Sequence, residues 1–243
     1  MQINKPLLEG SLNTRELGGY PCKSNRTVRF NRFLRSDGLF RITEKDRKLL
    51  KQKGLTLIID LRSRFETEFC PDPDLGVEYV NFPLLDHINS GITEQSGQFE
   101  LNEMYSSILV HNSDMIRDIM ICLAESQGCV LFHCTAGKDR TGVIAMLLLG
   151  LAEVDERIIA EDYAASAMNL NPFIQEKKAA FQAQGIRNAD HLLSSSVQQM
   201  RGTLEFIHRY FGSVKQYLEQ IGLSYSQITL LQQSLWEEGK HHG

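Results

Sequence analysis

The feature that most limits the fold of this chain is a short apolar run that leads directly into a long apolar helix pattern. Cys129–His133 reads CVLFH, which predicts a buried strand, and Arg140–Ala152 is apolar almost all round, which predicts a central buried helix. Only a short loop separates the two runs. This order is typical of an α/β fold in which helices flank a central, mostly parallel sheet.

Segments before this unit predict further strands and helices. The predicted elements are a helix over Thr43–Lys53, strands over Leu55–Leu61 and Val77–Phe82, and an amphipathic helix over Ser113–Gln127. Thr43 and Ser113 are the expected caps of the two helices. The polar residues 87–112 include two glycines and predict a long loop or lid.

The last third of the chain predicts helices alone. Asn171-Pro172 is an expected helix start, because proline is favoured at the first helical position, and Ser213 and Ser226 are expected caps of two later helices. No linker or internal repeat separates this part from the rest. We therefore expect a single domain that spans the chain, with an α/β core over 1–170 and a helical extension over 171–243.

Charge and composition exclude several classes of protein. Lys and Arg number 26 and Asp and Glu 30, so the formal charge is −4, whereas a domain that coats nucleic acid carries a basic excess. The longest apolar run, Val143–Ala152, is much shorter than the about 20 residues that span a membrane, and no apolar signal segment opens the sequence. The five cysteines include no C-x-x-C pair, which favours a reducing compartment. We expect a cytoplasmic protein, with export without a visible signal segment as the alternative. We expect no nucleic-acid partner and no integral membrane association.

The loop between the predicted strand and helix has the residues of an anion-binding site. At the start of a helix the free N–H groups and the helix dipole favour a negative charge, and Gly137 permits the tight curvature that such a loop needs. Cys134 opens the loop and Arg140 closes it. The amides, Lys138 and Arg140 all favour a thiolate, so we expect the pKa of Cys134 to lie well below about 8.5.

An ionised thiol in an anion site can carry out nucleophilic catalysis at phosphorus. Arg140 offers a planar fork of donors that fits two phosphoryl oxygens and can follow them into the transition state. Thr141 can donate its hydroxyl to the sulfur of Cys134, and His133 is expected to orient the loop through a backbone contact. The expected phosphate-binding residues are Thr135, Ala136, Gly137, Lys138, Asp139, Arg140 and Thr141. No paired metal-ligand spacing such as H-E-x-x-H occurs, so no metal is expected.

The segment HCTAGKDRTG resembles the phosphate-binding loop H-C-x5-R-[ST] of the cysteine-dependent protein tyrosine phosphatases. Its inner A-G-K-D-R-T-G resembles the atypical bacterial tyrosine and lipid phosphatase group of that superfamily. The other segments similar to this group are Asn13-Thr14-Arg15, Leu17-Gly18-Gly19, Leu34-Arg35-Ser36-Asp37, Ile59-Asp60-Leu61-Arg62-Ser63, Glu161-Asp162-Tyr163 and Tyr210-Phe211-Gly212-Ser213. The resemblance implies a phosphatase-like α/β fold and a phosphomonoester hydrolase that forms a phosphocysteine and needs neither metal nor cofactor.

A leaving oxygen needs a proton, which a positioned carboxylic acid supplies, and two aspartates compete for this role. Asp139 lies beside Arg140 in the loop, a placement that resembles the atypical bacterial group. Asp86 follows a predicted strand and resembles the upstream aspartate loop of the superfamily, although the usual Trp-Pro-Asp is absent. We favour Asp139 and keep Asp86 as the alternative.

Other charged residues near the predicted site have expected supporting roles. Asp60 is expected to form structural hydrogen bonds, to Arg62 or Arg35, rather than to react. Arg15, Arg62 and Arg64 are candidates for the rim of the pocket, where they would meet acidic or inositol headgroups. For at least one of these three arginines, a solvated surface position is the preferred interpretation.

Lys138 is the residue that bears most on the substrate. Its positive charge beside the anion loop suits phosphoinositides as well as phosphotyrosine. We expect a phosphotyrosine hydrolase, with phosphoserine, phosphothreonine and phosphoinositides as further substrates and inorganic phosphate bound in the loop. Two alternatives remain open: a catalytically silent phosphate-binding module, and a Cys-loop sulfurtransferase or arsenate reductase.

Overall fold

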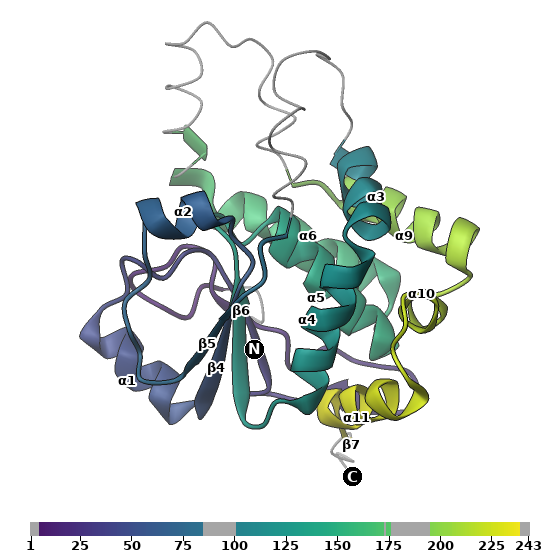
Figure 1. The fold of residues 1–243 in the computed structure, drawn as a ribbon, viewed down its shortest axis with the longest axis horizontal. Coiled ribbons are helices and arrows are strands. Elements are labelled where there is room, and N and C mark those ends of the chain that lie inside the picture. The colour runs from purple at the N-terminus through teal and green to yellow at the C-terminus, as the bar shows by residue number, and fades with distance from the viewer. Residues whose placement is uncertain (1–4, 85–100, 173, 176–194, 239–243) are drawn as a thin grey trace, which may run out of the picture.

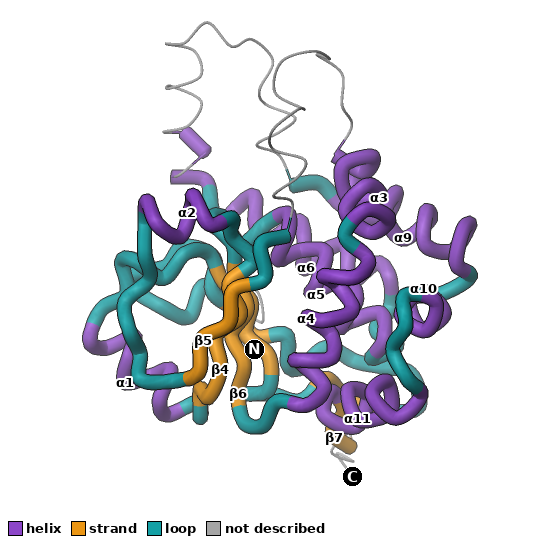
Figure 2. Tube along the Cα trace, in the orientation of Figure 1, coloured by secondary structure: helices purple, strands orange, loops and turns teal. Residues whose placement is uncertain are grey.

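The computed structural model describes residues 5–84, 101–172, 174–175 and 195–238. Its main sheet has five strands in the order β1-β3-β6-β4-β5, in which β1 is antiparallel to β3 and the other neighbours are parallel. The strands are β1 (Arg15–Glu16), β3 (Phe33–Ser36), β4 (Leu55–Asp60), β5 (Glu78–Asn81) and β6 (Cys129–His133). They gather at the centre of the trace (Figure 2), and the predicted α/β class with a mostly parallel sheet is confirmed.

Helices cover both faces of this sheet. The described helices are α1 (Glu44–Gln52), α2 (Arg64–Phe69), α3 (Leu101–His111), α4 (Ser113–Glu125), α5 (Asp139–Leu151), α6 (Glu156–Asn169), α9 (Val197–Phe211), α10 (Val214–Gln220) and α11 (Tyr225–Leu235). Helix α1 lies on one face, whereas α4, α5 and α6 lie on the other (Figure 1). Strands at the centre of such a sheet are therefore shielded on both sides, which explains their continuous apolar runs.

Strand β6 shows how its residues divide between the two faces. Cys129 and Leu131 pack in a small apolar cluster with Leu50 of α1. Val130 and Phe132 pack in the large cluster formed by the helices on the other face. Every residue of β6 is buried, and α5, which follows it, is buried along almost its whole length. The loop between β6 and α5 is thus held between two fixed elements.

The predicted helical C-terminal third is confirmed in α9, α10 and α11, but its last described residues are not helical. This part ends in β7 (Trp236–Glu238), which pairs antiparallel with β2 (Arg26–Val28). The indole of Trp236 donates to Ala152 O over 2.9 Å, and the guanidinium of Arg26 lies 3.4 Å from the centre of its ring. These contacts hold the C-terminal part against the C-terminal end of α5, which is the end away from the loop. No local pattern in the sequence indicates such a long-range pairing.

The prediction that residues 87–112 form a loop is wrong for their second half. Leu101–His111 is helix α3, in which Tyr105, Ile108 and Leu109 are fully buried. The helix forms because these apolar side chains lie on one face and pack against α4 and α9. Residues 85–100 lie outside the described part of the chain. No helix within the described ranges is long and apolar enough to cross a membrane.

Helix caps are predicted in part. The confirmed caps are Thr43 of α1 and Ser213 of α10. Asn112, rather than Ser113, precedes α4, and Ser224, rather than Ser226, caps α11. Ser224 is preferred because Gln227 follows at the spacing of a capping box. Residues 171–172 and 174–175 are helical, as Asn171-Pro172 predicts, and 176–194 lie outside the described residues.

Candidate active site

The loop predicted to bind an anion lies between the end of β6 at His133 and the start of α5 at Asp139. Gly137 in this loop has φ +64°, and a Cβ there would lie 2.4 Å from the carbonyl oxygen of Ser36. Only glycine adopts a left-handed backbone conformation this close to another strand without strain. The loop is therefore pressed against the end of β3.

Side chains behind the loop hold its carbonyl groups. Asn13 Nδ2 donates to Ala136 O over 3.0 Å and to Gly137 O over 3.1 Å. Arg35 Nη2 donates to the same Gly137 O over 2.9 Å. No cis peptide bond occurs in the described chain, and a trans peptide holds its N–H opposite to its C=O. The amides that follow these carbonyls therefore point away from Asn13 and Arg35.

A buried carboxylate, Asp162 of α6, fixes the arginines behind the loop. It accepts hydrogen bonds from Arg15 Nε over 3.1 Å and from Arg35 over a shorter distance. Burial raises the pKa of Asp162, but the charges of Arg15 and Arg35 outweigh this effect and hold the pKa below its ordinary value. A buried charge is costly unless it is paired, so the position of Arg35, and of the carbonyl it holds, is closely determined. Asp162 is not among the site residues expected from the sequence.

Glu66 of α2 also belongs to the site, although it is not among the site residues expected from the sequence. Its two oxygens accept hydrogen bonds from Arg140 Nη1 and Nη2, each over 2.7 Å, and Oε1 also accepts from the Thr135 hydroxyl. Oε2 accepts in addition from Ser63 N over 2.9 Å, as part of a capping box. The S-x-x-E spacing of that box is the signal in the sequence that predicts a helix start here. It does not predict the contact with Arg140.

The Glu66–Arg140 pair keeps both of its members ionised. Burial raises the pKa of Glu66, but the hydrogen bonds and the charge of Arg140 outweigh it and lower the pKa to about 2. Burial lowers the pKa of Arg140, yet the bonds to Glu66 and the nearby Cys134 sulfur raise it above its ordinary value. Arg140 is therefore a fixed cation beside the loop, as bidentate recognition of an anion requires.

Cys134 occupies the first position of the loop and is 2% exposed. The hydroxyl of Thr141 is also buried and has no hydrogen-bond partner among the described residues, so the expected bond to the Cys134 sulfur is not made in this structure. Cys129, at the other end of β6, is unsuited to nucleophilic attack, because burial raises the pKa of its thiol to about 12. Cys134 remains the candidate nucleophile.

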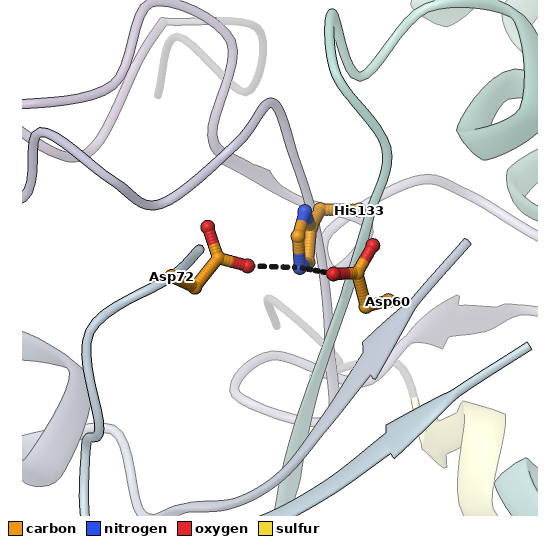
Figure 3. Close-up of side chains that lie close together, drawn as sticks. All are labelled: Asp60, Asp72 and His133. Carbon is orange, nitrogen blue, oxygen red and sulfur yellow. Dashed lines mark ion pairs between the residues drawn. The ribbon is translucent and has the colours of Figure 1, made fainter. Parts of the chain in front are cut away.

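His133 lies between two carboxylates, those of Asp60 and Asp72 (Figure 3). Its Nε2 is 3.0 Å from Asp72 Oδ2 and 3.8 Å from Asp60 Oδ2, and its Nδ1 is 3.4 Å from Cys134 O. The three side chains have the spacing of a metal site. Arg62, however, already binds the two carboxylates over 2.7 and 2.6 Å and supplies the balancing positive charge. The cluster thus supports the residue before Cys134 rather than forming a cation site.

Asp139, the favoured general acid, is the first residue of α5. Its Oδ1 accepts a hydrogen bond from the Tyr105 hydroxyl over 2.5 Å, and Lys138 Nζ lies 3.3 Å from the same oxygen. Only 5% of the Lys138 side chain is exposed, so its charge acts on Asp139 more than on the solvent above the loop. The alternative acid, Asp86, lies outside the described residues.

The expectation that Arg15 and Arg62 rim the pocket is wrong. Arg15 is fully buried and paired with Asp162, and Arg62 is 2% exposed and binds Asp60. Each guanidinium is held in the interior by a carboxylate that compensates for its lost hydration. Arg64 is exposed. The bond expected between Asp60 and Arg62 is present, whereas Arg35 binds Asp162 instead of Asp60.

Replacing Gly137 by alanine is expected to lower kcat/KM for an aryl phosphate about 100-fold. The new Cβ would meet the backbone of Ser36, so the loop must shift, and a displacement of about 1 Å at a reacting centre has an effect of this size. Steady-state kinetics measure the effect. Gly76→Ala is the matched control, because Gly76 has φ +68° with no atom within 4 Å of the new Cβ. Equal losses in both variants would show that backbone strain, and not the contact with β3, is responsible.

These observations define a class of protein. A buried cysteine is the first residue of a loop, and side chains behind the loop bind its carbonyl groups. An arginine that is paired with a glutamate lies beside the loop, and a carboxyl group lies at the start of the next helix. Such a site suits a tetrahedral anion that is attacked by sulfur. The fold and the site are those of a cysteine-dependent phosphate hydrolase.

Comparison with known proteins leads to the same class. A family model described as the tyrosine phosphatase family matches residues 6–237. A tyrosine-protein phosphatase of Nostoc commune is 33% identical, with 85% of this chain and 75% of that protein covered. The triple specificity protein phosphatase PtpB of Mycobacterium tuberculosis is 24% identical, with 91% of this chain and 95% of that protein covered. The chain belongs to the tyrosine phosphatase family and is a hydrolase.

Proposed function

We propose that the protein hydrolyses phosphotyrosine in two steps, through a phosphocysteine formed at Cys134. The observation that carries this proposal is the pairing of Arg140 with Glu66 beside a loop whose carbonyls are held by Asn13 and Arg35. Donors that are fixed before the reaction stabilise charge as it develops, because they need no rearrangement in the transition state. The loop is therefore suited to a phosphoryl group in transfer.

In the first step the thiolate of Cys134 attacks phosphorus, and the bond from phosphorus to the tyrosyl oxygen breaks. Arg140 and the loop amides bind the non-bridging oxygens during the transfer. Asp139 in its protonated form gives its proton to the tyrosyl oxygen, so that tyrosine leaves as the neutral phenol. The product on the enzyme is a phosphocysteine.

In the second step a water molecule attacks the phosphorus of the phosphocysteine. Asp139, now a carboxylate, accepts a proton from the water, and the bond between sulfur and phosphorus breaks. The buried hydroxyl of Thr141 is available to donate to the thiolate that leaves. Inorganic phosphate then dissociates and restores the starting site.

The five cysteines of the described chain are free thiols, which suits a reducing compartment such as the cytoplasm.

Phosphotyrosine is the preferred substrate in this proposal because of the position of Lys138. Its side chain is buried against Asp139, so it does not present a free charge to the second phosphate of a phosphoinositide. The name of the Mycobacterium relative, a triple specificity phosphatase, supports activity on more than one class of substrate. Phosphoserine, phosphothreonine and phosphoinositides are the further substrates in this proposal. The order of preference is therefore the quantity to measure.

A panel of substrates at equal concentration tests this proposal. We expect kcat/KM for a phosphotyrosine peptide to exceed that for the matching phosphoserine peptide and for a soluble phosphoinositide by about tenfold or more, since pocket contacts set such ratios. A chelator should leave all rates unchanged, because the proposed chemistry uses no metal. A higher value for the phosphoinositide would overturn the stated preference, and no turnover of any substrate would overturn the proposed function.

A further inference from the structure

We propose that Tyr105 of α3, itself held by Tyr163 of α6, is a positioning residue that fixes the carboxyl group of Asp139 for proton transfer. The inference rests on the proposed function, in which Asp139 is the general acid. Both tyrosines lie outside the loop and outside the set of site residues expected from the sequence.

The contact between Tyr105 and Asp139 is short and is buried on the side of Tyr105. The Tyr105 hydroxyl donates to Asp139 Oδ1 over 2.5 Å, and the tyrosine residue is fully buried. Burial, followed by the charge of Asp139, raises the pKa of Tyr105 well above its ordinary value. The hydroxyl therefore stays protonated at every pH at which the enzyme would work, and it remains a donor to the carboxyl group.

Tyr163 determines the direction of this hydrogen bond. Its hydroxyl lies 2.5 Å from the Tyr105 hydroxyl, and the two rings pack edge to face with centroids 5.8 Å apart. Tyr105 donates the single hydrogen of its hydroxyl to Asp139 Oδ1, so Tyr163 must be the donor in the bond between the two hydroxyls. The Tyr163 ring is itself packed against α5, because a Cβ at Gly142 would lie 3.0 Å from it. Asp139 is thus tied through two hydroxyls to the helix that it begins.

The two tyrosines restrict the orientation of the Asp139 side chain. Its side chain is 28% exposed, and it lies at the end of a helix where no preceding turn restricts it. Among the described residues, both of its contacts, to Tyr105 and Lys138, are made by Oδ1. Oδ2 is therefore the oxygen that can carry a transferable proton, in an orientation set by the bonds to Oδ1. Proton transfer needs a donor and an acceptor within hydrogen-bond reach, so this orientation bears directly on rate.

The test compares two substrates that differ in their need for an acid. The phenol released from phosphotyrosine has a pKa of about 10 and needs protonation, whereas 4-nitrophenyl phosphate releases a far weaker base. We expect Tyr105→Phe to lower kcat/KM for a phosphotyrosine peptide about tenfold, and to leave kcat/KM for 4-nitrophenyl phosphate within about twofold, because only the first depends on the acid. Tyr163→Phe should show the same selectivity with a smaller loss.

Two controls separate positioning from a structural effect. Tyr217→Phe removes another buried hydroxyl bond to α3, the one donated to Leu109 O over 2.8 Å, and should lower activity on both substrates equally or not at all. In an Asp139→Asn background, Tyr105→Phe should have no further effect on kcat/KM, since the group it positions can no longer donate a proton as an acid. Thermal unfolding of each variant reports its stability.

The results distinguish failure of this inference from failure of the proposed function. If the wild type hydrolyses both substrates but Tyr105→Phe slows them equally, as a destabilised fold would, Tyr105 is not a positioning residue. An additive loss in the Asp139→Asn background would overturn the inference as well. If the wild type hydrolyses neither substrate, the proposed function itself fails.

Discussion

Replacing Cys134 by serine is expected to lower kcat for any aryl phosphate by about 10,000-fold or more, the scale of losing a nucleophile. A hydroxyl is not ionised at neutral pH, so serine is a much weaker nucleophile than the thiolate it replaces. The variant should still bind a phosphotyrosine peptide, because Arg140, Glu66 and the loop amides are unchanged. Steady-state kinetics and calorimetric binding measure the two properties separately.

A trapping experiment makes this prediction specific to one sulfur. Wild-type protein mixed with substrate and quenched in acid should carry one phosphoryl group, which peptide mass spectrometry should place on Cys134. Cys129→Ala is the matched control, because Cys129 is a buried cysteine of β6, the strand that leads to Cys134, and its side chain lies in the other apolar cluster. Its activity should stay within about threefold of wild type, as for a modest change in the core. Label on any other residue would exclude Cys134 as the nucleophile.

The sequence predicts the central part of this fold because its signals there are local. An apolar run with both faces buried, followed by a glycine-containing loop and an apolar helix, defines β6, the loop and α5 within a residue or two of their observed bounds. The cysteine, the glycine and the arginine of the loop lie within one short segment, so their spacing along the chain already constrains their spacing in space.

The residues that complete the site could not be predicted in the same way. Glu66 meets Arg140 from a helix that follows another strand, and Asp162 meets Arg15 from far along the chain. Such pairs depend on which strands are neighbours and on the register between them, which local periodicity does not determine. The same reason explains why Arg15 was expected at the surface. From the sequence alone, a charged residue whose partner lies far along the chain cannot be distinguished from a solvated surface residue.

Replacing Arg140 by lysine is expected to lower kcat about 1,000-fold, the upper range for losing donors that stabilise a transition state. Lysine keeps the positive charge but has no planar fork, so it cannot bind Glu66 and two phosphoryl oxygens in fixed directions. KM should change much less than kcat, because the attraction of a dianion to a cation is retained while the stabilisation specific to the transition state is lost. Inhibition by vanadate, which mimics that state, should weaken by a similar factor.

Arg64→Lys is the matched control, since Arg64 is an exposed arginine on α2, two residues before Glu66. It should leave kcat and vanadate inhibition unchanged. Glu66→Gln tests the support of Arg140, because it removes one of the two charge-assisted bonds that hold the guanidinium. The loss of kcat in this variant should lie between the losses in the two arginine variants. A kcat for Arg140→Lys within about tenfold of wild type would contradict this prediction. Loss of a single preorganised donor already lowers kcat by about 100-fold or more, so the guanidinium would then contribute less than one such hydrogen bond.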